Sequence, residues 1–147
     1  MAQTGKEQLR LVIVTPTGEV VRASSVSEVT APGLLGDFGV LPGHIPFLSA
    51  LRPGVLTYVE DGHSHVVAVG EGFVEVGLKE EVVVLTDAAA TPETIDLEEV
   101  TREEEATARA LAALSPVDQP AEYRAARAAN AWAVARKEAA LRARSGG

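Results

Sequence analysis

Short hydrophobic runs separated by turn-forming residues dominate the chain up to about residue 90. The runs are rich in Val, Leu and Ile, and their length is that of β-strands rather than helices. Turn signals such as Thr15-Pro16-Thr17-Gly18 and Asp61-Gly62 lie between them. Strands this short and this closely spaced predict an antiparallel sandwich or barrel. The predicted strands are Leu9–Thr15, Glu19–Ala23, Val26–Ala31, Val55–Glu60, His65–Gly70, Phe73–Val76 and Val82–Thr86.

After about residue 91 the hydrophobic period becomes helical. Asp96 with Glu99 three residues later resembles a capping box, and apolar residues recur at roughly helical spacing up to Leu114. The segment Ser115–Pro120 ends this helix, and a second helix is predicted over Ala121–Arg144. Two helices joined by about six residues predict an antiparallel hairpin.

Charge and alanine content distinguish the two helices. Asp96–Ala113 has a net charge of −4 and Pro120–Arg144 a net charge of +4, which favours the two lying side by side. The second helix has eleven alanines, which favour helix but bury little area. We therefore expect a stable helix that is weakly docked and able to change position. Trp132 points away from the line of side chains expected to meet the first helix, which is formed by Tyr123, Asn130, Val134 and Leu141.

Composition excludes several functional classes. The chain has no cysteine, which excludes disulfides, zinc-thiolate sites and thiol catalysis. Its net charge of −8 argues against nucleic acid as a partner. The first ten residues contain no apolar stretch, so no secretory signal is expected. The longest apolar runs are strand-sized, so contact with a membrane is expected to be indirect.

The segment Pro32–Pro46 is rich in glycine, and three interpretations of it are open. It lacks the GxxxxGK[ST] pattern and a nearby lysine, which disfavours phosphate binding. The glycines either permit tight turns or form an exposed, preorganised loop that contacts another protein. His44, His63 and His65 suggest a metal-dependent enzyme, although nothing in the sequence brings His44 near the others. We expect no metal, cofactor or active site.

Taken in order, these segments resemble the epsilon subunit of bacterial and chloroplast F-type ATP synthases, whose mitochondrial counterpart is called delta. The most specific stretch is the run G-D-F-G-V-L-P-G-H-I-P at Gly36–Pro46. Weaker matches on either side run from about Leu9 to Ala90: Val14–Val20, Pro32-Gly33, Leu51–Gly54, Gly72–Val76 and Val82–Ala89.

The resemblance implies an α+β fold with two domains. An N-terminal antiparallel ten-stranded β-sandwich would occupy residues 1–90, followed by a C-terminal antiparallel two-helix hairpin at 91–147. The sandwich would bind the gamma subunit and the c-ring, forming the central-stalk rotor that couples proton translocation to ATP synthesis. The implied position is peripheral, on the cytoplasmic face of a bacterial inner membrane. The implied interface residues are Gly36, Asp37, Phe38, Gly39, Pro42, Gly43 and His44.

The resemblance also implies that the hairpin has two postures. Folded against the sandwich it is permissive, and extended along gamma into the alpha/beta catalytic head it restrains ATP hydrolysis. The basic second helix suits this role because the corresponding face of the head is acidic in this family. The residues expected to act on this regulatory helix are Tyr123, Arg124, Arg127, Trp132 and Arg136.

One segment departs from the family pattern. Some bacterial members bind ATP through I/L-D-x-x-R-A at the start of the first helix. Here the aligned stretch is Ile95–Val100, with Glu99 in the place of arginine, and a shift of register to Leu97 places Thr101 there instead. Neither side chain can hold a triphosphate as arginine does, so we expect ATP binding to be weak or absent.

A rival interpretation comes from another functional class. A ligand-binding β-sandwich with a helical dimerisation tail would have the same succession of strands and helices. It predicts a homodimer and small-molecule binding near Gly33–His44.

Overall fold

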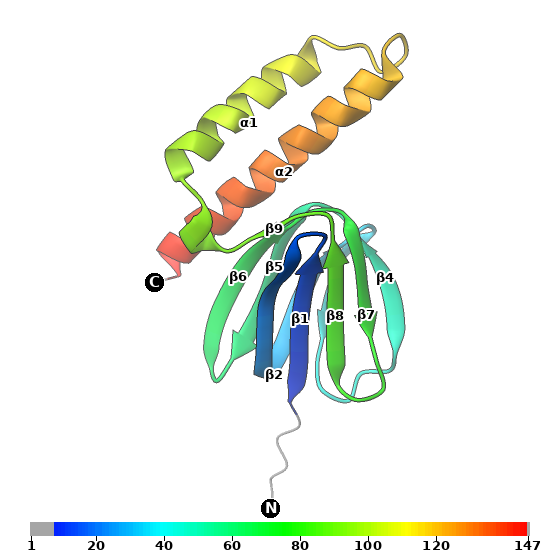
Figure 1. Ribbon diagram of the computed structural model, residues 1–147, viewed down its shortest axis with the longest axis vertical. Helices are drawn as coiled ribbons and strands as arrows, with labels where there is room; N and C mark the ends of the chain where they lie inside the picture. Colours follow the sequence, from blue (N-terminus) through cyan, green and yellow to red (C-terminus); the bar gives the residue numbers. More distant parts are fainter. Residues whose placement is uncertain (1–7, 147) are drawn as a thin grey trace, which may run out of the picture.

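The computed structural model describes residues 8–146. Most of the opening segment, on which the expectation of no secretory signal rests, lies outside the described residues. The strands are β1 (Leu9–Thr15), β2 (Gly18–Gly33), β3 (Gly36–Val40), β4 (Phe47–Leu51), β5 (Gly54–Glu60), β6 (His63–Val69), β7 (Gly72–Val76), β8 (Glu81–Thr86) and β9 (Ala89–Ala90). The 3-10 helix η1 (Pro92–Thr94) and the helices α1 (Leu97–Ala112) and α2 (Pro120–Ser145) follow (Figure 1).

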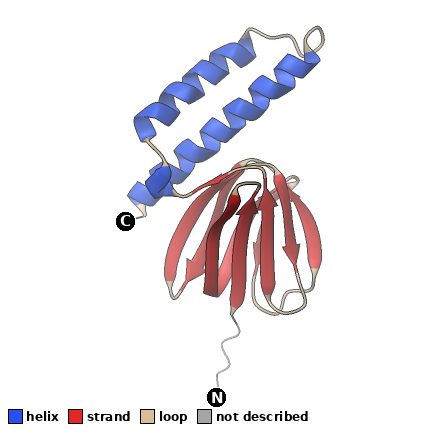
Figure 2. Ribbon diagram, in the orientation of Figure 1, coloured by secondary structure: helices blue, strands red, loops and turns tan. Residues whose placement is uncertain are grey.

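The predicted α+β fold is confirmed, with all strands preceding the helices (Figure 2). The described strands number nine rather than ten, because two stretches predicted as separate strands join in β2. The first half of β2 pairs with β1 up to Val26, and the second half pairs with β5 from Val26 onward. Counting the two halves separately gives the predicted number. One pairing, between β1 and β8, is parallel rather than antiparallel.

Three strands, β3, β4 and the two-residue β9, were not predicted from the sequence. β3 contains two glycines and an aspartate, residues that are depleted in strands. It forms because β2 supplies a template, with register from Val29 opposite Val40 to Gly33 opposite Gly36. The glycine-rich segment is therefore largely half of a β-hairpin, and only 41–46 is an open loop.

The core lies between the two layers of the sandwich and consists mainly of Val, Leu, Ile and Ala. Burial alternates along β8, as expected for a strand with one face inward. The largest fully buried side chains are Leu9, Leu11, Ile13, Leu56, Val26, Val29, Val40, Val67, Val69, Val74, Val82 and Val84.

The hairpin lies against the sandwich through α2, which packs on β5 and β6 while α1 packs on the other side of α2 (Figure 1). The predicted attraction between the helices is confirmed: Arg136 forms an ion pair of 2.6 Å with Glu103, and Lys137 one of 2.9 Å with Glu104. The predicted start of α1 is also confirmed, because the Asp96 carboxylate accepts a hydrogen bond from the Glu99 amide at 3.1 Å.

The prediction of which α2 residues face α1 was only partly correct. Asn130 donates to the Glu104 carbonyl and to the Thr107 hydroxyl, as expected of the α1-facing side. Val134 and Leu141, by contrast, are 39% and 46% exposed. The buried positions of α2 are all alanines, because a helix packed on two sides accommodates small side chains at both contacts. They are Ala133, Ala135, Ala139 and Ala140.

Gly72 offers a direct test of the packing between β7 and β8. A Cβ at this position would lie 1.9 Å from the Leu85 carbonyl oxygen and 2.7 Å from the Thr86 Cα, both of them backbone atoms. We expect Gly72→Ala to lower the free energy of unfolding by at least about 2 kcal/mol, measured by denaturant titration. Gly39→Ala is the matched control, because its Cβ would meet only the Val29 carbonyl oxygen at 3.9 Å. Equal stabilities of the two variants would contradict this packing.

Candidate interface surfaces

The residues predicted to form the interface begin at the β2–β3 turn. Gly36 has φ of +136°, a left-handed conformation that favours glycine, and it closes a tight turn at Leu34 and Leu35. Both leucines are exposed, by 63% and 101%. The next residue, Asp37, forms an ion pair of 2.6 Å with Arg52, and both side chains remain accessible.

Three further predicted residues lie beyond the other end of β3. Pro42, Gly43 and His44 occupy the loop between β3 and β4. The Gly43 amide donates a hydrogen bond of 2.8 Å to the Glu80 carboxylate. The His44 ring lies 5.0 Å from the ring of Phe47, so the loop is held by specific contacts.

The structure therefore divides the predicted interface into two parts. Gly36 and Asp37 lie at one end of β3 and Gly43 and His44 beyond the other, with a strand of about 13 Å between them at about 3.3 Å per residue. Phe38 and Gly39, in the middle, differ in burial: Phe38 packs edge-on against Phe47 at 5.5 Å, and Gly39 is exposed.

An apolar surface that was not predicted from the sequence lies on the outer side of β1, β8, β7 and β4. Phe73 pairs with Ala50 on one side and Leu85 on the other, and Leu85 pairs with Val14. Leu48, Phe73 and Leu85 are 68%, 54% and 51% exposed. We call this surface, formed by Val14, Leu48, Ala50, Phe73 and Leu85, the open face.

Hydrophobic periodicity could have revealed the open face. In β8, Val82 and Val84 point inward, yet the alternate position Leu85 is also apolar. A strand with one solvated face is expected to carry polar residues there. The unbroken apolar run of β8 was the available signal that its outer face is apolar as well as its inner face.

The residues predicted on the regulatory helix lie in two groups along α2. Arg124 and Arg127 are exposed, Tyr123 is half-buried, and the two arginines line a groove of about 440 Å³ with Arg52 and Leu34 of the sandwich. This groove places the first half of α2 near the end of the sandwich that carries Asp37.

Trp132 and Arg136 occupy the joint between hairpin and sandwich. Trp132 is partly buried and packs against a cluster formed by Ala68, Ala135 and Ala139. Because Ala68 belongs to β6, the surface that Trp132 contacts is the sandwich. The Arg136 guanidinium lies 5.3 Å from the Trp132 ring centroid, which places a cation over an aromatic face. With its ion pair to α1, Arg136 connects both helices at this joint.

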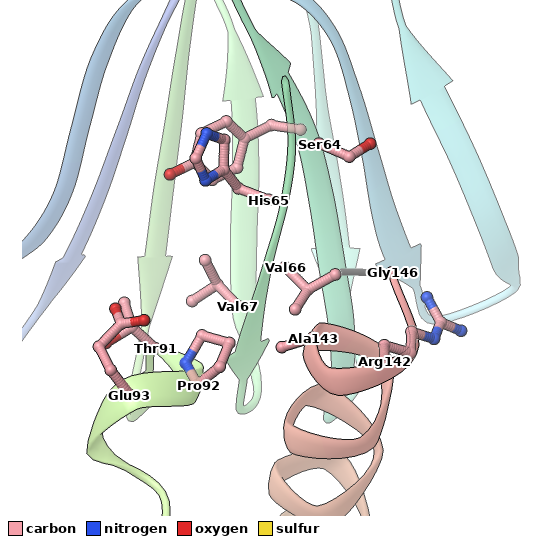
Figure 3. Close-up of a pocket in the computed structure, with 11 residues that line it drawn as sticks. Ser64, His65, Val66, Val67, Thr91, Pro92, Glu93, Arg142, Ala143 and Gly146 are labelled. Carbon is pink, nitrogen blue, oxygen red and sulfur yellow. The ribbon is translucent and has the colours of Figure 1, made fainter. Parts of the chain in front are cut away.

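A cleft of about 280 Å³ lies where the end of α2 meets β6 and η1 (Figure 3). The Tyr58 ring stacks on His65 at 4.9 Å in its wall, with Glu93 and Arg142 at its rim. Burial raises the pKa of the Tyr58 phenol above its ordinary value of 10.0, and the nearby carboxylates of Glu60 and Glu93 add to the effect.

Tyr58 predicts a loss of stability at alkaline pH. The unfolded chain ionises this phenol at about pH 10, whereas the folded chain keeps it protonated to higher pH. The stabilising contribution is complete below about pH 10 and is lost as pH rises through the folded pKa. We expect Tyr58→Phe to lose less stability than the parent chain above about pH 10, measured by urea titration at stepped pH. Parallel pH profiles of the two proteins would contradict the shift.

The three histidines are not brought together as a metal site. His63 and His65 lie on β6, and His44 lies in the β3–β4 loop. Across residues 8–146, no group of three or more His, Cys, Asp or Glu side chains is arranged to hold a metal ion.

The strands described above match a known protein family. A model of the family described as ATP synthase, Delta/Epsilon chain, beta-sandwich domain matches residues 8–92. The chain belongs to this family. The matched region contains every strand of the sandwich and both ends of the predicted interface.

Curated relatives in this family include bacterial ATP synthase epsilon chains. The epsilon chain of Geobacter sp. (strain M21) is 45% identical over 116 residues, covering 77% of this chain and 80% of the relative. That of Nitratidesulfovibrio vulgaris (strain DP4) is 42% identical over 131 residues, covering 89% and 94%. The second match includes most of the helical hairpin, so the similarity extends past the sandwich.

Solved structures with the same fold come from mitochondrial ATP synthases. A chain of the Euglena gracilis OSCP/F1/c-ring assembly superposes with a TM-score of 0.77 at 22% identity, covering 96% of this chain and 86% of that one. A chain of the Tetrahymena thermophila central stalk/c-ring superposes with a TM-score of 0.62 at 18% identity, covering 93% and 99%. The family resemblance predicted from the sequence is thus confirmed. Within residues 8–146, neither helix has the length and hydrophobicity needed to cross a membrane.

Proposed function

We propose that this chain is a non-catalytic rotor subunit of an F-type ATP synthase, which links the gamma subunit to the c-ring. The observation that carries the proposal is the open face on a member of the delta/epsilon family. Leu48, Phe73 and Leu85 form an exposed apolar surface on the strands that α2 leaves uncovered. Such a surface on a small acidic protein marks a protein interface.

The gamma subunit is the partner that we assign to the open face. An apolar surface continuous with a preformed loop suits a stable contact between parts that turn together. The β3–β4 loop, which contains His44, adjoins the open face, because it leads directly into β4, whose first residues are Phe47 and Leu48. We assign this loop to gamma as well.

The c-ring is the partner that we assign to the opposite end of β3. The exposed leucines of the β2–β3 turn provide apolar contact, and Asp37 offers a carboxylate to a basic polar loop of the ring. Asp37 is already paired with Arg52, so a ring contact would have to compete with that pair. Both groups are accessible, and exposed pairs contribute about 0–1 kcal/mol, so this competition costs little.

The helical hairpin is the element that we propose restrains ATP hydrolysis. In the folded posture seen here, α2 is held by alanine contacts and by ion pairs to α1. Release from the sandwich would free the basic residues of α2 for the acidic surface of the catalytic head. The small area of the alanine contacts suits an equilibrium of a few kcal/mol that partners can reverse.

Nucleotide is not part of this proposed regulation. In one register Thr101 aligns with the family's triphosphate-binding arginine. In the other the aligned residue is Glu99, which lies at the start of α1 near Asp96 and Arg136. A carboxylate there repels a triphosphate, so the hairpin is proposed to respond to protein partners. The rotor role places the chain at the cytoplasmic face of a bacterial inner membrane through its partners.

Proton pumping tests the proposed coupling role. ATP synthase depleted of its own epsilon subunit is reconstituted in vesicles, and ATP-driven acidification is measured with and without the full chain. The proposal predicts that added chain raises the protons pumped per ATP hydrolysed. An unchanged ratio, with no binding of the chain to the depleted enzyme, would contradict it and favour the ligand-binding alternative.

A further inference from the structure

The Glu80 side chain links a loop and a turn at one end of the sandwich. The Glu80 carboxylate accepts a hydrogen bond of 2.8 Å from the Gly43 amide, across 37 positions of sequence. Gly43 belongs to the β3–β4 loop and Glu80 to the β7–β8 turn. The ladder joins these segments where Phe47 of β4 pairs with Val76 of β7, and the Glu80 side chain adds a second contact further along the loop, at Gly43.

Glu80 is itself fixed from a third direction. The Arg10 backbone amide donates a hydrogen bond of 2.9 Å to the Glu80 carbonyl oxygen, which attaches the turn to the start of β1. The backbone of Glu80 is thus anchored to the sheet while its side chain reaches the loop. Motion of the β3–β4 loop away from the sheet would break the bond to Gly43.

The backbone at Glu80 is unfavourable for its residue type. Its φ of +59° lies in the left-handed region that favours glycine, and only one other non-glycine residue among 8–146 shares it, Asp61 at +51°. A glycine at position 80 would relieve this strain and still close the turn. The glutamate side chain therefore has a use that local turn stability does not explain.

Exposed apolar side chains surround the joined turns. Leu41 and Ile45 on the loop are 56% and 74% exposed, and Leu78 on the turn is 86% exposed. The loop leads into β4, and the turn joins β7 to β8, so these three side chains lie at the ends of strands that form the open face. Without the Glu80 bond, the part of the loop that precedes Phe47 would lose this contact with the turn.

We propose that Glu80 is a positioning residue that holds the two turns together as one preformed extension of the open face for the gamma subunit. This inference rests on the proposed function and adds a residue to it. Fixing a loop before binding reduces the conformational entropy lost in the complex. We therefore expect the preformed loop to lower the dissociation rate of the complex with gamma more than it changes the association rate.

Three variants separate positioning from folding. Glu80→Gly removes the carboxylate while relieving the backbone strain, so its thermal stability is expected to equal or exceed that of the parent chain. Glu80→Gln keeps an oxygen that can accept from Gly43 in a weaker, neutral bond. Asp61→Gly is the matched control, because it makes the same backbone change in the β5–β6 turn, away from Gly43.

Binding of the full-length variants to epsilon-depleted head complex containing gamma is measured by biolayer interferometry, and Gly43 amide exchange by NMR of the free chain. We expect Glu80→Gly to bind about three- to tenfold more weakly through faster dissociation, with faster Gly43 exchange and undiminished stability. Glu80→Gln is expected to recover most of the affinity, and Asp61→Gly to match the parent.

Two different failures are distinguishable. If the parent chain binds and Glu80→Gly binds equally well, or its Gly43 amide exchanges no faster, the positioning role is wrong and the proposed function stands. If the parent chain itself fails to bind the head complex, the proposed function is overturned and the role of Glu80 with it.

Discussion

Replacement of Phe73 by glutamate is expected to weaken binding to the gamma subunit by at least about thirtyfold, or about 2 kcal/mol, the loss typical of a central interface residue. Phe73 lies in the middle of the open face, in register with Ala50 and Leu85, and is 54% exposed in the free chain. A carboxylate there would be buried without a partner in the complex. Titration of the variant against epsilon-depleted head complex measures the loss.

The control for this variant lies on the hairpin. Leu141 is 46% exposed on α2, so Leu141→Glu makes a similar change on a similarly exposed apolar residue outside the open face. It is expected to bind gamma through the sandwich as the parent chain does. Both glutamate variants should keep the stability of the parent chain, because neither site is in the core. Equal affinities of the two variants would remove the open face as the docking surface.

Replacement of Ala139 by leucine is expected to release the hairpin from the sandwich. Ala139 is fully buried against Ala68 and Ala135, and a larger side chain there overpacks the contact at a cost of about 1–3 kcal/mol. That cost is comparable to the few kcal/mol expected to separate the two postures. Amide exchange in α2 should become faster, and ATP hydrolysis by the reconstituted head complex slower.

Ala129→Leu is the matched control for this experiment. Ala129 is an exposed position of the same helix, so the substitution keeps helix propensity and adds the same volume without a clash. Its exchange and hydrolysis rates should equal those of the parent chain. If Ala139→Leu leaves both rates unchanged, the alanine contact does not control the posture of the hairpin.

The sequence predicted strands best where β-branched residues formed continuous runs. β1 was predicted with its observed bounds, and β5, β6, β7 and β8 to within two residues at each end, because Val and Ile signal strands through local propensity. β3 could not be found in this way, since Gly36 and Gly39 carry no strand signal. Its formation depends on pairing with β2, which is a tertiary contact.

The helical hairpin was predicted in outline, and its contacts only in part. Charge correctly placed α1 beside α2, and Asp96 correctly began the first helix. The apolar line through Val134 and Leu141 was misleading, because the docked faces of α2 use alanine, which gives little hydrophobic contrast. Small residues permit close packing without producing the periodicity on which the prediction relied.

The candidate interface was likewise predicted only in part from the sequence. A local motif identified the segment from Gly36 to His44, but a linear stretch gives no indication that β3 separates its two ends. The contact of Glu80 could not be predicted either, because its partner Gly43 is 37 positions away. Contacts of this separation become visible only when the sheet order is known.

Removal of the hairpin separates docking by the sandwich from inhibition by the helices. Head complex stripped of its own epsilon subunit is mixed with the full chain or with a version ending at Ala90, the last residue of β9. Binding and ATP hydrolysis are recorded together. We expect both versions to bind gamma and only the full chain to slow hydrolysis. If neither version binds, the assignment of this chain to the rotor is contradicted.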